Sequence, residues 1–334
     1  MHRRLLAVLA GALLLCACGW SHTAQAQSCC GVASEDELSV AGFERRAVLT
    51  SKLAVTHMLG RHDSDGVYSS LPDGVSATDA QLVLGAGVRM PFYEPLQLHG
   101  SFPVRVQYRA LPGATGEQTS STAIGPGDAL LFVRWSALRD DERGLFDADS
   151  TAIPSLDVYV GGKAPTARHE DGPSAHDQAR TMGDGTFALI VGARAIKHVT
   201  PEHALRVSAR YELHGSREVD DATSAYDRFN PGDKIGLAVG YLGLSGMQWA
   251  FGGTIDLAFT TASSSRAPGE DFRDIANTEQ RELTIGAHLT RMISMPQLDL
   301  TLGITYTPPI DQLSKNTTLE GIAGGLTLRW NWMR

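Results

Sequence analysis

Apolar and polar residues alternate along several segments of this chain, and this alternation constrains the fold more than any other feature. Across residues 96–110, one parity is mainly apolar and the other carries His99, Arg105 and Arg109. Only a β-strand places successive side chains on opposite faces. The segment is longer than the roughly five or six residues of a common globular strand, and a strand crossing a bilayer needs roughly 9–11. The pattern therefore predicts a membrane-spanning strand.

The same alternation recurs along the chain, in residues 205–214, 249–260, 282–290, 298–306 and 322–332. Weaker strands are expected near residues 48–59, 81–90, 128–135, 156–163, 187–198 and 234–244. The total is about twelve, an even number, as single-chain bacterial barrels prefer. We therefore predict an all-β fold, a single transmembrane antiparallel β-barrel formed by residues 47–334.

Long polar connections alternate with short ones. The long connections are residues 62–78, 112–125, 165–184, 215–233 and 262–277, with a shorter one at 308–319; the short ones are 92–95, 200–203, 245–246 and 294–297. This alternation predicts long loops outside the cell, tight turns in the periplasm, and both termini periplasmic. Residues 139–154 break the rule, because they form a long acidic connection where a short turn is expected. We interpret them as a periplasmic flap or as a sign of a misplaced strand.

The first 26 residues have the features of a secretory signal peptide. Basic residues at positions 2–4 precede an apolar stretch at 5–20, and Ala24-Gln25-Ala26 supplies a cleavage site. The alternative is a lipobox, which would make Cys18 a lipidated N-terminus. Cleavage after Ala26 would leave residues 27–46 as a flexible periplasmic arm. Its Cys29 and Cys30 are adjacent, which strains a mutual disulfide, so a free or intermolecularly paired thiol is favoured over a metal site.

The inward positions of the predicted barrel are polar and charged. The lumen-lining residues that we predict are Arg105, Arg109, Arg206, Arg210, Glu212, Asp256, Glu282, His288, Asp299 and Arg329. Such charges must be hydrated or paired, so they form either a pore lining or an ion-paired plug. The excess of basic residues among inward positions favours anionic solutes.

Aromatic residues are expected at the two membrane interfaces, where ring bodies lie in lipid and polar edges in water. Tryptophans fall at the periplasmic strand ends, and tyrosines with Phe187 and Phe259 towards the opposite ends. The interface residues that we predict are Trp135, Trp249, Trp330, Trp332, Tyr108 and Tyr306.

Other classes of function are disfavoured. The formal net charge is -8, which argues against a nucleic-acid surface. No cofactor or metal site is predicted. Ser208 and His288 are inward on strands that are not neighbours, and no G-x-S-x-G motif is present, so we predict that the chain is not an enzyme.

The chain resembles outer-membrane barrels grouped as transporters, including the family linked to phenol-degradation pathways. The resemblance rests on Gly125-Pro126-Gly127-Asp128 before a strand and on the aromatic C-terminal segment 326–332. Unlike the usual outer-membrane pattern, Met333 and Arg334 follow the last aromatic residue. No substrate can be carried over from the resemblance. With the strand pattern and the signal peptide, we predict a Gram-negative outer membrane location, the lipid bilayer and the barrel-insertion machinery as partners, and a passive channel or transporter for small solutes with a charged lumen. The alternatives are a closed structural or surface-interaction barrel and a soluble exported all-β protein.

Overall fold

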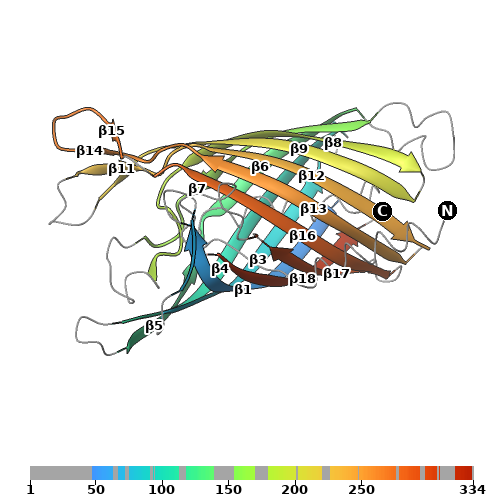
Figure 1. Ribbon diagram of the computed structural model, residues 1–334. Coiled ribbons are helices and arrows are strands. Elements are labelled where there is room, and N and C mark those ends of the chain that lie inside the picture. Colours follow the sequence, from blue (N-terminus) through green and yellow to red (C-terminus); the bar gives the residue numbers. More distant parts are fainter. Residues whose placement is uncertain are drawn as a thin grey trace.

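The computed structural model describes a single β-barrel (Figure 1). The described residues are 47–62, 67–71, 75–90, 93, 95–112, 118–138, 154–169, 180–200, 202–219, 226–246, 248–275, 278–293, 298–306, 308 and 320–332. The predicted signal peptide, the arm at 27–46, Cys18, Cys29 and Cys30 lie outside them, as does the connection at 139–153.

Twelve strands form the barrel wall. They are β1 (Ala47–His62), β3 (Ser76–Arg89), β4 (Leu96–Pro112), β6 (Ala129–Leu138), β7 (Ser155–Ala164), β8 (Ala188–Thr200), β9 (His203–His214), β12 (Lys234–Ser245), β13 (Trp249–Thr260), β16 (Gln280–Ile293), β17 (Leu298–Tyr306) and β18 (Glu320–Trp332). Each pairs antiparallel with the next in this order, and β18 pairs with β1 from Ala47↔Trp332 to Gly60↔Glu320. The predicted fold class and strand number are confirmed.

The two ends of the barrel differ. At one end, called here the short-turn end, β8 joins β9 and β12 joins β13 through a few residues, and Ala47 lies opposite Trp332. At the other, called here the long-loop end, the connections are long and carry further strands: β2 (Tyr68–Ser70), β5 (Gln118–Pro126), β10 (Arg217–Glu218), β11 (Arg228–Asn230), β14 (Ser264–Arg266) and β15 (Arg273–Asp274). Figure 1 shows β11, β14 and β15 projecting beyond the wall at this end.

Four of the predicted loops are therefore wrong in part, because they contain short strands, among them β2 within residues 62–78. Residues 118–126 form β5, which extends the β4 ladder from Val104↔Pro126 to Pro112↔Gln118. Strands β10, β11, β14 and β15 form a separate four-stranded sheet. The error has a physical cause: short strands rich in Ser, Thr, Arg and Asp have the composition of loops, and pairing with a neighbour supplies the stability that their own sequence lacks.

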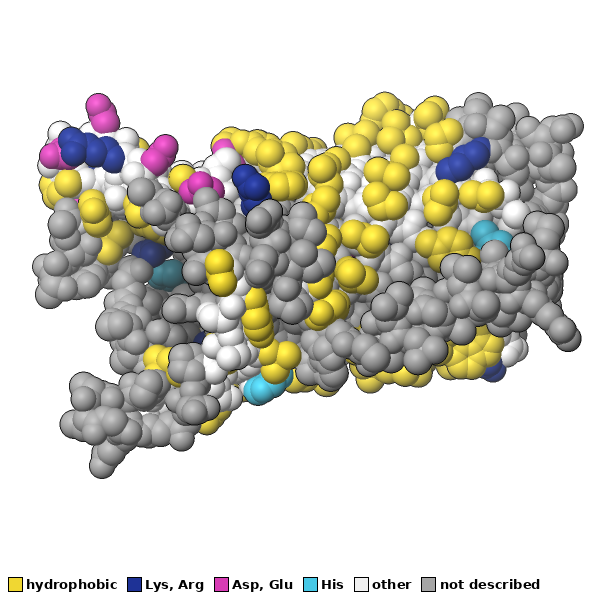
Figure 2. All heavy atoms as spheres, viewed as in Figure 1, with side chains coloured by type: hydrophobic (Ala, Val, Ile, Leu, Met, Phe, Trp, Pro, Cys, Tyr) yellow, Lys and Arg dark blue, Asp and Glu magenta, His cyan; other side chains and the backbone are white. Residues whose placement is uncertain are grey.

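Side chains alternate between the two faces of the wall as predicted. On β4, Phe102 and Val106 are exposed, whereas Ser101, Arg105 and Gln107 between and beside them are buried. The other strands show the same alternation, with large apolar residues exposed on one parity of each strand. Examples are Leu53, Leu131, Leu189, Val239, Ile255 and Leu302. Figure 2 shows hydrophobic side chains spread over the outer wall, with charged ones gathered beyond it at the long-loop end. A barrel with an apolar outer face and a polar inner face is the arrangement expected in a bilayer.

Within the described residues, no helix is long and apolar enough to cross a membrane.

Candidate functional site in the barrel lumen

The inner face has two unlike halves. Strands β4 and β6–β9 present large side chains, including Arg105, Phe132, Asp157, Lys163 and Glu212, all of them buried. Strands β12–β18 present mainly small ones, which alternate with the exposed apolar residues: Gly236, Ala238, Gly240, Ala250, Gly252, Thr254, Gly286, Thr290, Thr301, Gly303, Gly325 and Thr327. The small residues on these strands leave the inner wall less filled than the wall formed by β4 and β6–β9.

The residues predicted to line the lumen all have the inward parity. Six of them are buried: Arg105, Arg109, Arg210, Glu212, Asp299 and Arg329. The other four are partly exposed: Arg206, Asp256, Glu282 and His288. The structure brings two pairs of them together: Arg210 lies 2.6 Å from Glu212, and Arg329 lies 3.7 Å from Asp299.

A segment that connects β7 to β8 crosses the inner face at the long-loop end. Its residues 180–187, called here the rim segment, include the buried Met182, Asp184 and Thr186. The Met182 carbonyl accepts a hydrogen bond from Arg105 Nη1 of β4 at 3.1 Å, and the Met182 amide donates to the Arg168 carbonyl at 2.8 Å. The rim segment is thus tied to the wall on one side through β4.

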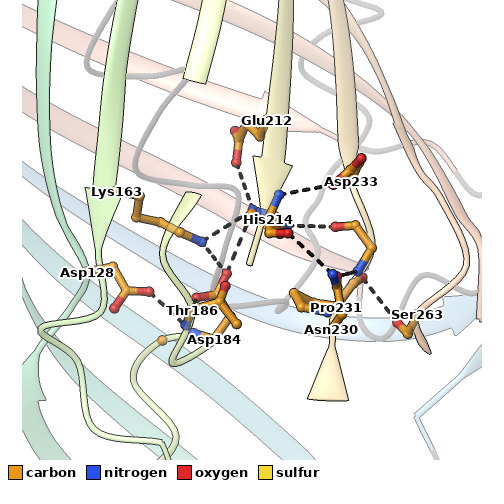
Figure 3. A network of polar contacts seen from close by, with 12 residues as sticks. Asp128, Lys163, Asp184, Thr186, Glu212, His214, Asn230, Pro231, Asp233 and Ser263 are labelled. Atoms are coloured by element: carbon orange, nitrogen blue, oxygen red, sulfur yellow. Dashed lines mark hydrogen bonds and ion pairs between the residues drawn. The ribbon is translucent and has the colours of Figure 1, made fainter. Parts of the chain in front are cut away.

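On the other side, an ion-paired network holds the rim segment to β7 and β9 (Figure 3). The Asp184 carboxylate contacts Lys163 Nζ and lies 3.9 Å from His214 Nε2. His214 Nε2 is also 3.3 Å from Glu212 Oε2 and 3.5 Å from Lys163 Nζ. The four side chains are almost fully buried. Because buried charges are tolerated only when paired, this network fixes the position of the rim segment.

A turn before β12 orients the His214 ring. Its Nδ1 lies 2.6 Å from the Gly232 carbonyl, which can only accept, so Nδ1 carries a proton. Nε2 is therefore the atom that faces Lys163 and Glu212. Gly232 has φ of 85°, and a Cβ there would collide with the Thr261 carbonyl. The turn needs glycine for both reasons.

Asp128, between β5 and β6, fastens both ends of the β7–β8 connection. Its carboxylate accepts hydrogen bonds from the amides of Ala167 at 3.2 Å and Asp184 at 3.3 Å. Burial and the nearby Asp184 charge raise the pKa of Asp128 to about 6, against the opposing effect of Lys163. For Asp184, burial acts to raise the pKa, but the Lys163 ammonium and hydrogen bonding hold it below its ordinary value. The two carboxyl groups thus differ in their readiness to take a proton.

A second ion-paired cluster lies near the short-turn end. Asp157 Oδ2 contacts Arg134 Nη2 at 2.6 Å and Arg194 Nη2 at 2.7 Å, and Ser136 donates to Asp157 Oδ1 at 2.8 Å. A single carboxylate is therefore shared by two guanidinium groups. His99 of β4 stacks on Phe132 beside this cluster, with ring centroids 5.0 Å apart.

Sequence reasoning missed several parts of the site. It did not select Asp184, because a loop residue carries no periodic signal. His214 continues the inward alternation of Arg210 and Glu212 by two residues, so the signal for it was present. The buried inward cluster of Leu130, Phe132, Tyr159 and Ile190 was also missed, because apolar residues on both parities of β6 hide the alternation.

The aromatic residues predicted at the interfaces lie near the strand ends. Trp135, Trp249 and Trp330 are exposed at the short-turn end, and Arg291 stacks over the Trp249 ring at 4.7 Å. Trp332 pairs with Ala47 at that end, but its side chain lies outside the described part. Tyr108 and Tyr306 are partly exposed towards the long-loop end.

Ser208 of β9 and His288 of β16 are separated by β12 and β13. No group of three or more potential metal-binding side chains occurs among the described residues.

No family model matches the sequence, and neither does the sequence of any curated protein. Several solved structures match the fold. An outer membrane channel from Pseudomonas putida is similar with a TM-score of 0.63 and 12% identity, covering 86% of this chain and 96% of that one. The translocator domain of the autotransporter NalP from Neisseria meningitidis has a TM-score of 0.49 and 11% identity, covering 90% and 92%. The NanC porin has a TM-score of 0.42 and 10% identity, covering 84% and 100%.

At these identities the similarity to the Pseudomonas putida channel shows the fold. The resemblance to outer-membrane barrels, drawn from Gly125–Asp128 and the C-terminal strand, is confirmed at that level. In the structure Gly125 and Pro126 end β5, and Gly127 and Asp128 precede β6, as the resemblance implies.

Proposed function

We propose that this chain is an outer-membrane β-barrel through which small solutes pass passively along a charged lumen. The observation that carries the proposal is the division of a closed twelve-stranded wall into an apolar outer face and a charged inner face, on which β12, β13 and β16–β18 present mainly small residues. A twelve-stranded barrel leaves a narrow path for solutes only if part of its inner wall carries no large side chains. The Gly, Ala and Thr residues of β12–β18 provide such a wall.

The cellular context follows from the same proposal. The apolar face of the wall contacts the lipid bilayer, and the signal peptide at 1–26 directs export before the barrel-insertion machinery places it in the outer membrane. The long-loop end then faces outward and the short-turn end faces the periplasm.

A closed barrel is the second candidate, and the rim segment favours it. Residues 180–187 are bound to β4, β7 and β9 across one side of the long-loop end, which narrows the opening. In that case the lumen would be structural, and the four-stranded sheet at the long-loop end would be the working surface.

Single-channel recording in a planar bilayer separates the two candidates. The channel proposal predicts discrete conductance steps from folded wild-type protein. Asp184→Ala, which releases the rim segment from Lys163, should give larger or more frequent openings. Asp227→Ala is the matched control, because it removes a carboxylate from an exposed ion pair outside the wall. Silent wild-type protein with heat-modifiable gel migration would favour the closed barrel.

A further inference from the structure

His214, the last residue of β9, faces groups that suit two protonation states of its ring (Figure 3). Nδ1 lies 2.6 Å from the Gly232 carbonyl and keeps its proton in both states. Nε2 lies 3.5 Å from Lys163 Nζ and 3.3 Å from Glu212 Oε2. In the neutral ring Nε2 accepts a hydrogen bond, and Lys163 is the donor; in the charged ring Nε2 donates one, and Glu212 is the acceptor. A proton on Nε2 therefore decides which of these two side chains His214 binds.

The change of partner alters how firmly the rim segment is held. Asp184 of the rim segment is paired with Lys163 Nζ, and its carboxylate also lies 3.9 Å from His214 Nε2. When His214 is neutral, Lys163 divides its hydrogen bonds between Asp184 and the ring. When His214 is charged, Lys163 is left to Asp184, and a second positive charge faces the same carboxylate. A proton on His214 therefore strengthens the attachment of Asp184 to the wall in two ways.

Charges of both signs surround the ring. The Lys163 ammonium opposes a positive charge on His214, whereas the carboxylates of Glu212 and Asp184 favour it. Both states of the ring thus have partners in the same site. The charged and titratable groups that face His214 or the rim segment are Lys163 of β7, Asp184 itself, Arg210 and Glu212 of β9, Asp233 and Lys234 at the start of β12, Asp128 between β5 and β6, Arg105 of β4, and His169 and Arg217 beside Gly183 and Gly185.

Asp128 acts on the rim segment in the same direction. Hydrogen bonds from the Ala167 and Asp184 amides favour its ionised form, but burial and the Asp184 charge raise the pKa of Asp128 to about 6. Above this pH, its negative charge repels the Asp184 carboxylate and competes for Lys163. Below it, protonated Asp128 leaves Lys163 to Asp184. Mild acid therefore tightens the rim segment through Asp128 as well as through His214.

The rim segment lies where a change in its attachment alters the opening. It crosses the inner face at the long-loop end, and Asp184 joins it to β7 and β9. Asp184 stands between Gly183 and Gly185, and Gly185 has φ of 68°. Glycines on both sides give the backbone freedom to change direction once the carboxylate is released.

We propose that the rim segment is a pH-dependent gate of the proposed channel, held across the long-loop end in mild acid by the proton on His214 and released at higher pH. This inference rests on the proposed function and adds its regulation. The bistable element is the rim segment, and the charge change that biases it is on an imidazole ring. Solutes should pass most freely at neutral to mildly alkaline pH.

The first test is single-channel recording of folded protein in potassium chloride at about pH 5.5 and about pH 8.5, the range in which histidine commonly changes its charge. The ratio of open to closed time in wild-type protein should be about tenfold higher at the higher pH, as expected for the loss of a charge-assisted hydrogen bond. His214→Gln, which does not titrate, should be open at both pH values. Asp128→Asn should reduce the response and leave the part that depends on His214.

His57→Gln is the matched control for the loss of an imidazole. His57 lies on the exposed outer face of β1, with Nδ1 2.9 Å from Thr78 Oγ1, so this variant should keep the wild-type pH response. Heat-modifiable gel migration checks that each variant is folded. Opening in acid, a response that persists in His214→Gln, or its loss in His57→Gln overturns the gate and leaves the channel standing.

A spin label at residue 181 of the rim segment, in protein without its native cysteines, supplies a second readout that needs no current. The label should be more mobile at about pH 8.5 than at about pH 5.5 in otherwise wild-type protein. Asp184→Ala should leave it mobile at both, and this variant tests the gate even where His214→Gln does not fold. A label response in folded protein that passes no current overturns the proposed channel alone, and a label insensitive to pH overturns the gate.

Discussion

The Lys163–Asp184 ion pair joins a loop to the barrel wall in surroundings that exclude water, with relative side-chain exposures of 4% and 1%. If the Asp184 carboxylate is removed, the Lys163 ammonium stays buried, and solvent cannot reach it to take the place of the carboxylate. Glu212 and His214 are close, but Glu212 is already held by Arg210. At the scale of single residues, the stability of the rim therefore depends on Asp184 more than on any exposed charge.

We expect Asp184→Ala to lower the free energy of unfolding by about 3–5 kcal/mol, because it leaves the buried Lys163 without its partner. Denaturant titration of the folded barrel in detergent micelles measures the change. Asp227→Ala should cause no measurable loss, since its ion pair with Arg266 is solvent-exposed. Equal losses from both variants would contradict the importance given to burial.

Asp128 predicts a dependence of stability on pH. Its pKa in the folded barrel is about 6, above the ordinary value of 3.8, so folding favours its protonated form. The stability that this preference contributes is fully present below about pH 4 and is lost as the pH rises through about 6. It amounts to at most about 3 kcal/mol.

Asp128→Asn removes this dependence. The variant should gain stability relative to wild-type protein as the pH rises from about 5 to about 7. The pKa of Asp184 is shifted in the opposite direction, below its ordinary value. Its contribution to the stability of the folded barrel is therefore present at neutral pH and is lost only in acid. Thermal unfolding at a series of pH values measures the difference, and a constant gap between wild type and variant would show that Asp128 does not titrate in this range.

At the scale of strands, glycine allows large inward side chains to lie flat along the wall. The Tyr159 ring of β7 lies over Gly192 of β8, and the Cβ of Phe132 on β6 lies close to Gly161 of β7. A methyl group at Gly161 would collide with Phe132 and with the Leu131 carbonyl. The packing of the inner face therefore depends on residues that have no side chain.

Gly161→Ala should lower the free energy of unfolding by about 1–3 kcal/mol, as overpacking usually does. Gly324→Ala is the control, because a Cβ at that exposed position of β18 meets nothing within 4 Å. It should be neutral. Denaturant titration of both variants tests the comparison, and a harmless Gly161→Ala would mean that β6 and β7 can separate without cost.

How much of these strands could be predicted depends on the kind of signal. The alternation of β4, β9 and β13 is a direct consequence of two-faced surroundings, so their existence and facing could be read from the residues. The rim segment and the β10–β11–β14–β15 sheet could not, because their positions come from contacts between distant residues such as Asp184 with Lys163 and Asp227 with Arg266. Pairing partners of this kind leave no periodic pattern in a single sequence.

At the scale of the whole molecule, every part of the account depends on which medium meets each face of the wall. If lipid covers the outer face, exposed side chains such as Leu237 and Val239 are in their favoured surroundings. If the inner face holds water, its charged side chains are hydrated or paired at little cost. The proposed function requires this division.

Accessibility of spin labels along β12 measures the division directly. Labels are placed one at a time, in protein without its native cysteines, at residues 235–240, where Ile235, Leu237 and Val239 are exposed and Gly236, Ala238 and Gly240 have the opposite parity. In lipid vesicles, accessibility to oxygen should be high at the odd positions, and accessibility to a polar nickel reagent should be high at the even ones. Alternation in the reverse sense, or none at all, would contradict the account.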